Sequence, residues 1–282
     1  PMPTVLQTRG PCREALHPFS VVAVGERSVI GRLGEPGVTT WRSAAKPFQL
    51  AVSLACLGDP DLGDETLAVG AASHSGEPQH VALVTAALER FGLDLSALRC
   101  ATHPPAYVPA ADAILRADGQ FDDRHNNCSG KHTFMAAAAR HQGWDPDYRA
   151  PDHPLQARIR AAVVQVCGEE PLVAVDGCGV PTFGFSLEGL ARAWQHLAQA
   201  VADREAGHTL PGTFEDRLGR VGAAMGRHPY LTSGTGRFDA AVMAGAREPM
   251  VVKVGAMGLF CLAFPARRVG MPAFGQRPRH AL

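Results

Sequence analysis

The apolar and polar positions along this chain of 282 residues alternate between helical and strand-like spacing. Apolar residues at helical spacing predict helices over residues 43–57, 78–91, 129–141, 153–166, 186–202 and 214–225. Ser43 suits the N-terminal boundary of the first helix. Pro47 falls in its first turn, where the missing N–H group does no harm.

Shorter apolar runs bounded by turn residues predict strands at residues 19–24, 27–33, 66–72, 172–175 and 250–254. The first two strands are expected to form a hairpin that turns at Gly25 and Glu26. The segment 100–127, rich in Pro, Asp and Ala, is expected to be the least regular part. This mixture predicts an α/β (α+β mixed) fold, a sheet with helices packed on it, in a single domain over residues 1–264.

The end of the sequence has a different composition. No acidic residue follows Glu248, and residues 265–282 are rich in arginine, proline and glycine. Segments of this composition bury too little apolar surface to offset the entropy of ordering them. Residues 265–282 are therefore expected to form a disordered tail.

The composition narrows the possible classes of binding partner and the possible cellular compartment. The 27 basic and 27 acidic residues cancel, and no basic stripe interleaved with aromatic residues supports a nucleic-acid partner. A small-molecule substrate is expected instead. The longest uncharged apolar stretch, residues 254–265, is shorter than the ~18 residues of a membrane span and is expected in the core. Seven cysteines without a C-x-x-C pair and no signal-peptide pattern predict a cytoplasmic protein.

Lysine is scarce in this sequence. Of its 27 cationic residues only Lys46, Lys131 and Lys253 are lysines. Burial or a neighbouring cation can remove the proton of a lysine, whereas arginine stays charged at any relevant pH. The three lysines are therefore candidates for a general base or a metal ligand, although drift in an arginine-rich genome would also leave a few.

The tetrapeptide SAAK places Ser43 and Lys46 one helical turn apart, so the amine can reach the hydroxyl. A desolvated lysine can remove the proton of a serine nucleophile, and a helix N-terminus favours developing negative charge. A second serine, Ser75, and then Lys253 in a strand-like run follow in the order used by serine β-lactamases and penicillin-binding proteins. Ser75 beside Gly76 is equally typical of a turn.

A second group of residues lies in HNNCSGKH and DGCG. Cys128 and Cys178 as thiolates, with a neutral Lys131, could bind zinc. Alternatively, Cys128 is itself a nucleophile with His125 or His132 as its base, or simply a buried thiol. Further along, Arg42 suits a substrate carboxylate and Asp176 suits an ammonium group, or each belongs to a structural ion pair.

Several long segments resemble the L-asparaginase II family, a class distinct from the threonine-nucleophile bacterial asparaginases and the self-cleaving plant type. They are TRG, RSAAKPFQ, ASHSGEPQHV, HNNCSGKHTFMA, HPLQ, VDGCGVPT, GTGRFD and KVGAMG, in order over about residues 8–258. The resemblance implies a fold similar to that of the serine β-lactamases, and hydrolysis of L-asparagine to L-aspartate and ammonia. It also implies a homodimer.

The resemblance assigns roles residue by residue. It implies that Ser43 is the nucleophile with Lys46 as its base, and that Ser75 and Lys253 form a second Ser/Lys pair. It implies a zinc site at Cys128, Lys131 and Cys178, in which zinc orients the substrate rather than generating hydroxide. Arg42, His132 and Asp176 match positions beside the bound amino acid.

The sequence departs from the family pattern in three places. Ala15 replaces a serine, Met257 replaces a glutamate, and a further lysine-containing segment with a D-G motif is absent, so the C-terminal part is expected to be shortened. Two other hypotheses are therefore retained beside the amidohydrolase. One is a relative with impaired or no catalysis that binds a small amino acid, and the other is a serine acyltransferase similar to β-lactamases.

Overall fold

The computed structural model describes residues 2–26, 28–35 and 37–275. The strands are β1 (Thr4–Arg9), β2 (Cys12–Val24), β3 (Val29–Leu33), β4 (Val38–Thr40), β5 (Leu172–Val175), β6 (Pro181–Ser186), β7 (Val251–Val254), β8 (Leu259–Phe264) and β9 (Val269–Gly275). The helices are α1 (Lys46–Cys56), α2 (Asp64–Gly70), α3 (Pro78–Arg90), α4 (Val108–Arg116), α5 (Ser129–His141), α6 (Pro154–Cys167), α7 (Leu187–Glu205), α8 (Phe214–Arg227), α9 (Pro229–Thr232) and α10 (Phe238–Gly245). Short 3₁₀ turns are η1 (Arg42–Ala45), η2 (Leu95–Ala97), η3 (Asp123–His125), η4 (Ala256–Gly258) and η5 (Pro265–Arg267).

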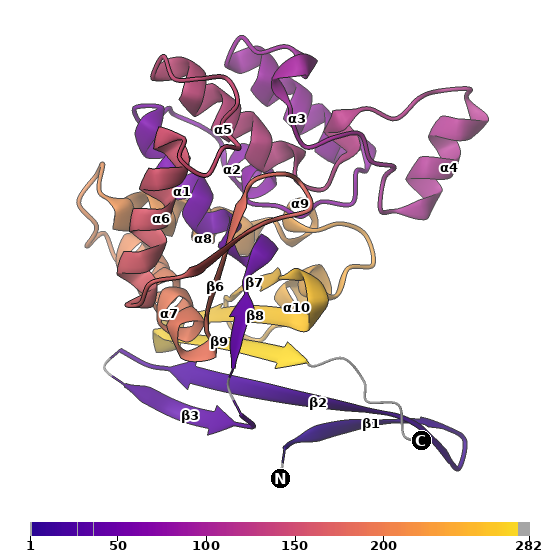
Figure 1. Cartoon of the computed structure of the whole chain (residues 1–282), viewed down its shortest axis with the longest axis vertical. Coiled ribbons are helices and arrows are strands. Elements are labelled where there is room, and N and C mark those ends of the chain that lie inside the picture. The colour runs from indigo at the N-terminus through magenta and orange to yellow at the C-terminus, as the bar shows by residue number, and fades with distance from the viewer. Residues whose placement is uncertain (1, 27, 36, 276–282) are drawn as a thin grey trace.

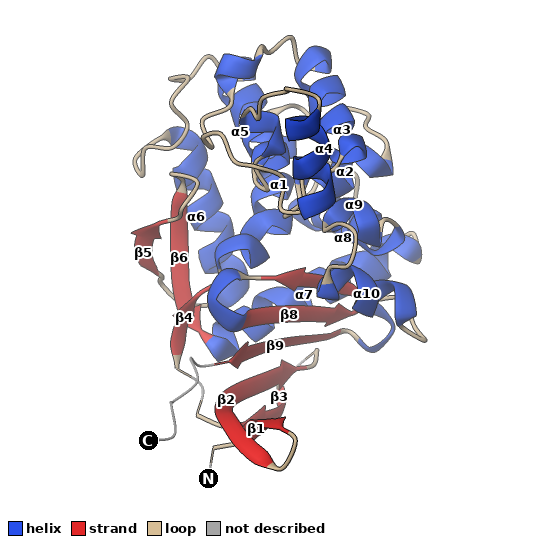
Figure 2. Cartoon of the chain, turned by 90° about the vertical axis from the view of Figure 1, so that its right-hand side faces the viewer, coloured by secondary structure: helices blue, strands red, loops and turns tan. Residues whose placement is uncertain are grey.

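The strands form two antiparallel sheets. The larger sheet has the order β1-β2-β9-β8-β7, with β3 also paired to β2. The smaller sheet has the order β4-β6-β5 and lies at one side of the molecule (Figure 2). The last strand in sequence, β9, therefore sits between β2 and β8 and joins the N-terminal strands to the rest of the sheet.

Most helices gather on one side of the larger sheet (Figure 1). The long helix α7 packs along β9, β2 and β8, while α1 contacts α5, α6 and α8 at the centre of the helical part. The turn η1, which leads into α1, contacts β7 and β8. The start of α1 is thereby placed where the helices meet the sheet.

The helix predictions are confirmed to within a few residues at each boundary. Ser186 and His153 cap α7 and α6, each accepting a hydrogen bond from the first helical turn. The predicted hairpin is also confirmed, since β2 and β3 pair antiparallel with Val24 opposite Val29. The predicted mixed fold, with helices packed on a sheet, is confirmed as well.

Two local predictions are wrong. The segment 66–72, expected as a strand, lies mostly in α2, where Leu67, Ala68 and Val69 are buried. A short apolar run has no decisive period, and packing against α8, α3 and α5 selected the helix. The segment expected to be irregular contains α4, a helix with no buried residue that projects at the right of Figure 1.

The prediction of a disordered tail from residue 265 is wrong for residues 265–275. These residues form η5 and β9, and β9 pairs with β2 on one side and β8 on the other. Composition did not reveal this strand because its partners are distant in sequence. The remainder of the predicted tail, residues 276–282, lies outside the described residues.

One large hydrophobic cluster runs from Val22 to Ala263 and includes residues from both sheets and most helices. A smaller cluster under α10 contains Met243, Met250, Val252 and Leu262. Val254 to Pro265, expected in the core, contains the largely buried β8. Within the described ranges, no helix combines the length and apolar character needed to cross a membrane.

Candidate active site

Lys46, the first residue of α1, is fully buried with 1% of its surface exposed. Its Nζ donates hydrogen bonds to the Ala72 carbonyl (2.6 Å), the Ser73 hydroxyl (3.0 Å) and the Asn127 carbonyl (3.0 Å). Burial lowers the pKa of Lys46 and the charge of Lys131 lowers it further, against the opposing effect of Cys128 and Cys178. The structure thus holds an amine that is shifted towards its neutral form.

The geometry around Lys46 singles out Ser73. A neutral amine carries two N–H groups and one lone pair, and the two carbonyl partners can only accept hydrogen bonds. The Ser73 hydroxyl is the partner that can donate to the lone pair, at 3.0 Å. Ser75, predicted to form a second Ser/Lys pair with Lys253, donates from its hydroxyl to the Ser233 carbonyl (3.1 Å). The sequence analysis assigned no role to Ser73, because nothing in the segment SHS indicates that this hydroxyl meets Lys46.

Ser43 lies in η1, one turn before Lys46, and is half-buried. The Lys46 backbone N–H donates to the Ser43 carbonyl, so the two residues share one tight turn. Arg42 just before it has a left-handed backbone (φ 44°), a conformation that costs a non-glycine residue about 1–3 kcal/mol and is common at functional sites. In the described chain Lys46 Nζ is hydrogen-bonded to the three groups above and not to the Ser43 hydroxyl, which leaves that hydroxyl available to a ligand.

Lys253, on β7, completes the basic part of the site and is fully buried. Its Nζ donates to the Val254 carbonyl (3.2 Å). Burial, reinforced by the charge of Lys46, lowers the pKa of Lys253 to about 7. Two buried lysines therefore lie close enough to influence each other, and burial favours the neutral form of both.

Cys128, Lys131 and Cys178 form a buried group beside Lys46. Lys131 Nζ donates to Cys178 Sγ (3.1 Å), and the two thiols hydrogen-bond to each other. The bond from Cys178 holds the pKa of Cys128 well below its usual range, against burial and with help from Lys46 and Lys131. The same bond, together with burial, raises the pKa of Cys178. Burial lowers the pKa of Lys131, but the two thiols outweigh it and the pKa is raised.

The donor set of this group fits a zinc ion, because two thiols and one amine converge at a buried point. Over the residues that the structure describes, no cluster of three His, Cys, Asp or Glu side chains is placed to hold a metal. A metal at this point would therefore depend on Lys131 as the third ligand. The pKa of Lys131 is raised by the two cysteines beside it, so a metal ion would have to displace the Lys131 proton for the amine to serve as a ligand.

Arg42 and Asp176 are joined to each other. Arg42 Nη2 and Nε both donate to Asp176 Oδ1, at 2.6 and 2.8 Å. Burial would raise the pKa of Asp176, but the hydrogen bonds from Arg42 and the Gly177 N–H, with the charges of Lys131 and Arg42, together keep the pKa lowered. Both side chains are partly exposed, so each could exchange its partner for one end of a zwitterionic ligand.

His132 is buried beside Lys131 with an exposure of 0%. Its Nδ1 is hydrogen-bonded to the Tyr148 hydroxyl (2.9 Å), while Nε2 is buried without a partner in the described structure. Burial, then the charges of Lys131 and Lys46, hold the pKa of His132 well below its usual range. The ring is neutral, with one nitrogen free for a further contact.

The segments around Ser75 and GTGRFD interlock, a feature that the sequence did not predict. The Glu77 carboxylate accepts from the Thr235 N–H (2.8 Å) and hydroxyl (2.7 Å). A side chain at Gly234 would lie 2.1 Å from Ser75 Oγ, so this position has room only for glycine. The buried Asp239, which accepts from Ser233, adds a carboxylate close to Lys253.

A family model described as L-asparaginase II matches residues 5–273 of this chain. The match spans every candidate residue from Arg42 to Lys253. A comparison with curated proteins found no match.

Solved structures were compared as well. Mglu in its native form shares 16% sequence identity at a TM-score of 0.47, over 92% of this chain and 59% of that chain. Mglu in its glutamate form shares 16% identity at a TM-score of 0.48, over 92% and 56%. A protein from Bacteroides dorei DSM 17855 described as a beta-lactamase shares 13% identity at a TM-score of 0.46, over 92% and 85%. The chain thus spans 59% of the length of native Mglu.

Proposed function

Because this chain belongs to the L-asparaginase II family, matched over residues 5–273, we propose that it is an amidohydrolase that converts L-asparagine to L-aspartate and ammonia. The observation that carries the proposal is the burial of Lys46 against Ser73, one turn after Ser43. A buried amine bonded to a hydroxyl group can activate a serine without a histidine. The family match supports the reaction class, and the geometry around Lys46 supports the choice of reacting side chains.

The proposed reaction begins at Ser43. Its hydroxyl oxygen forms a bond to the side-chain amide carbon of asparagine, and its proton passes to the neutral Lys46 amine. The C–N bond then breaks and Lys46 returns the proton to the departing ammonia. Water hydrolyses the resulting ester by the reverse proton path, which releases aspartate and restores Ser43.

Ser73 and Lys253 support this cycle. Ser73 holds the Lys46 amine and can carry a proton between it and the reacting groups over the 3.0 Å hydrogen bond. Lys253, with its pKa lowered to about 7, is a second base close to Lys46. The N–H groups at the start of α1 and the loop of Ser73 are suited to stabilise the developing oxyanion.

The amino-acid end of the substrate is assigned to Arg42, Asp176 and His132. Arg42 would take the α-carboxylate and Asp176 the α-ammonium, each exchanging its present partner. The buried, unpartnered Nε2 of His132 would accept or donate one further hydrogen bond. Asparagine and glutamine differ by one methylene, which a pocket typically distinguishes only about 10- to 200-fold.

We also propose that Cys128, Lys131 and Cys178 hold a zinc ion. Bound there, zinc would supply a fixed positive charge that orients the substrate, with one of its four positions left for a ligand. Cys128 and Cys178 would bind as thiolates and Lys131 as the neutral amine. The free state of all seven cysteines supports a reducing compartment, and we propose a cytoplasmic homodimer.

The test is ammonia release from L-asparagine and L-glutamine by the purified chain, beside its Ser43→Ala variant. We expect turnover of asparagine that is lost in the variant, while the circular dichroism spectrum is unchanged. Turnover retained in Ser43→Ala would eliminate the serine mechanism. Asparagine binding without ammonia release would favour the non-catalytic relative, and covalent labelling of Ser43 by a β-lactam would favour the acyltransferase.

A further inference from the structure

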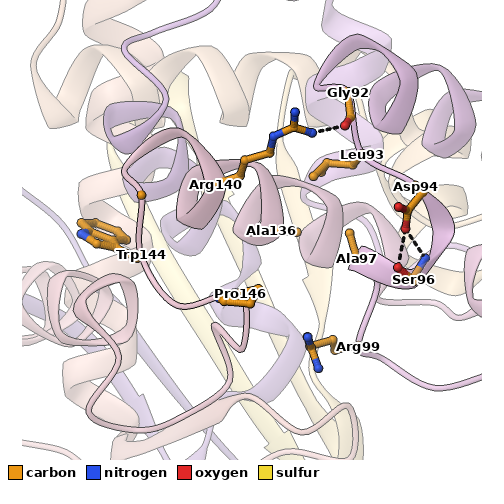
Figure 3. Close-up of a pocket in the computed structure, with 11 residues that line it drawn as sticks. Gly92, Leu93, Asp94, Ser96, Ala97, Arg99, Ala136, Arg140, Trp144 and Pro146 are labelled. Carbon is orange, nitrogen blue, oxygen red and sulfur yellow. Dashed lines mark hydrogen bonds between the residues drawn. The ribbon is translucent and has the colours of Figure 1, made fainter.

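A pocket of about 440 Å³ lies between the end of α3, η2 and α5 (Figure 3). Its wall includes Arg99, Arg140, Asp94, Leu93 and Trp144, and contains none of the candidate active-site residues. The pocket is therefore distinct from the site around Lys46.

The pocket has an excess of unpaired positive charge. Across the described chain, neither Arg99 nor Arg140 takes part in an ion pair. Arg99 Nε is buried without a hydrogen-bond partner, and Arg140 donates only to the Gly92 carbonyl. A buried guanidinium N–H without an acceptor is costly, so a site of this kind gains by binding an anion.

The acidic groups nearby are already engaged. Asp94 accepts hydrogen bonds from the Ser96 N–H (2.8 Å) and from the Ser96 hydroxyl. Asp147, which lies near Arg99, accepts from Arg149 Nε (2.7 Å) and Nη2 (2.8 Å). Asp94 is close enough to Arg140 for the arginine to help lower the pKa of its carboxyl, so the two arginines exceed the acidic residue of the pocket wall by one positive charge.

The two arginines lie on opposite sides of the pocket. Figure 3 shows Arg140 above and Arg99 below, with Ala136, Ala97 and Pro146 at intermediate height. A ligand that reached both guanidinium groups would have an anionic group at each end and an aliphatic middle. We propose that this pocket binds a small linear dicarboxylate.

Hydrogen bonds connect the pocket to His132. The Arg99 backbone N–H donates to the Tyr148 hydroxyl (3.1 Å), which is also bonded to the Ala97 carbonyl (3.3 Å) and to His132 Nδ1 (2.9 Å). Tyr148 is fully buried, and its hydroxyl links the backbone of Arg99 to the imidazole, which gives a ligand bound at Arg99 a route to His132. On the proposed function, the dicarboxylate therefore modulates asparagine binding, and this coupling is reciprocal.

Isothermal titration calorimetry of the full chain tests the binding, with succinate, glutarate, adipate and the monocarboxylate butyrate as probes. We expect at least one dicarboxylate to bind more tightly than butyrate. Removing one charge-assisted contact in Arg99→Gln or Arg140→Gln is expected to weaken binding about tenfold or more. The matched control is Arg116→Gln, which removes an exposed arginine on α4 and is expected to leave the affinity unchanged.

Succinate could also enter the candidate active site, and the arginine variants separate the two locations. Equal affinity in wild type, Arg99→Gln and Arg140→Gln would overturn the proposal, as would the absence of binding at millimolar concentrations. Arg140 lies on the surface of α5, so its variant remains informative if Arg99→Gln fails to fold. If butyrate bound as tightly as every dicarboxylate, the pocket would not recognise an anionic group at each end of the ligand, and the proposal would be wrong.

The proposed coupling between the pocket and asparagine binding is tested by a separate measurement. The bound dicarboxylate is expected to change the KM for asparagine in wild type but not in Tyr148→Phe, which retains the pocket and loses the hydrogen bond to His132. An unchanged KM in wild type with the dicarboxylate bound would overturn the coupling. If the chain shows no asparagine turnover at all, the proposed function fails while the calorimetry still decides the pocket.

Discussion

The hydrogen bonds of Lys46 show how one residue depends on segments that are remote in sequence. Its three partners come from the loop after α2 and the loop before α5, 26, 27 and 81 positions away. The sequence predicted Lys46 as a base from its scarcity and its spacing to Ser43. It assigned no role to Ser73, because only the fold brings this hydroxyl to the Lys46 amine from 27 positions away.

The different contacts of Ser73 and Ser75 give a prediction. Ser73→Ala is expected to lower kcat by about 10²- to 10⁴-fold, the usual contribution of a positioned proton-transfer group. Ser75→Ala, two residues away, loses only its bond to the Ser233 carbonyl and is expected to cost about 1 kcal/mol of stability with kcat little changed. Steady-state kinetics and urea unfolding of both variants measure this. Equal losses of kcat would mean that the structure does not distinguish the two serines.

Lys253 predicts a pH dependence of stability. Burial lowers its pKa from 10.5 to about 7, so between these values the unfolded chain binds a proton that the folded chain does not. Stability therefore gains from Lys253 as pH rises through this window, and below about pH 7 the full cost of burying the charge is present. Lys253→Met removes that cost.

Urea unfolding at several pH values tests this expectation. Relative to wild type, Lys253→Met is expected to be most stabilised at pH 7 and below, and the advantage should shrink as the pH approaches 10. Parallel stability curves for the two proteins between pH 7 and 10 would show that the lysine keeps its proton inside the folded chain.

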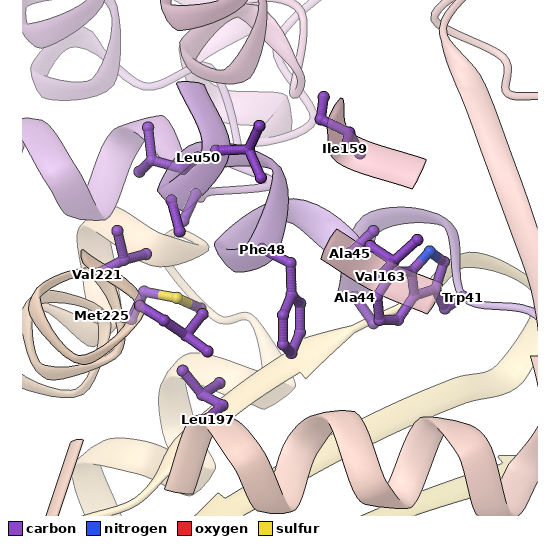
Figure 4. Packing of buried hydrophobic residues seen from close by; sticks show 14 of the residues in the cluster. Trp41, Ala44, Ala45, Phe48, Leu50, Ile159, Val163, Leu197, Val221 and Met225 are labelled. Atoms are coloured by element: carbon purple, nitrogen blue, oxygen red, sulfur yellow. The ribbon is translucent and has the colours of Figure 1, made fainter. Parts of the chain in front are cut away.

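At the scale of elements, the turn that carries Ser43 is anchored by aromatic packing. Trp41 stacks on Phe48 at 5.2 Å between ring centroids, and Phe48 meets Trp194 of α7 edge-on at 6.4 Å. Figure 4 shows Trp41 and Phe48 among the packed side chains, with Ala44 and Ala45 beside Trp41. The periodic apolar pattern predicted α1 because its buried face is local information. The left-handed Arg42 and the 3₁₀ turn before α1 arise from this packing and leave no mark in the pattern.

The strand β9 illustrates the opposite case. Its composition predicted disorder, and yet β2 and β8 pair with it on both sides, because pairing with distant strands is not encoded in local composition. Gly270 is central to its position. A Cβ at this residue would lie 2.0 Å from the Gln195 nitrogen and 2.4 Å from the Ala191 carbonyl oxygen of α7. The close approach of α7 to the sheet therefore requires glycine here.

Gly270→Ala is accordingly expected to destabilise the fold by at least about 1–3 kcal/mol, the usual cost of overpacking. The control is Gly275→Ala on the same strand, where the nearest heavy atom to an added Cβ is 3.8 Å away. Thermal unfolding of the two variants should show a lower Tm for the first and little change for the second. Similar Tm values would contradict the packing of β9 under α7.

At the scale of the whole molecule, the candidate site forms where the helical part meets the sheet. The start of α1, the loops around Ser73 and Asn127, the β5–β6 loop with Cys178, and β7 with Lys253 converge there. The order of motifs along the sequence predicted these residues as candidates. Their convergence, and the pairing of Arg42 with Asp176, follow from the fold and not from spacing.

This convergence lets the metal proposal be tested as a property of the whole fold. A ligand that binds the folded chain and not the unfolded one stabilises it by about 2.7 kcal/mol at a concentration one hundred times its Kd. Zinc is therefore expected to raise the Tm of wild type and not that of Cys178→Ser, with chelation reversing the gain.

Cys12→Ser is the matched control, because Cys12 is an exposed free thiol outside the site. It should retain the zinc content and the Tm gain of wild type, measured by elemental analysis and thermal unfolding. Loss of zinc in Cys12→Ser with full content in Cys178→Ser would place the metal on the surface thiol. Because the thiols of Cys128 and Cys178 come from loops fifty residues apart, only the folded arrangement brings them together, and a Tm gain that depends on Cys178 would report that arrangement directly.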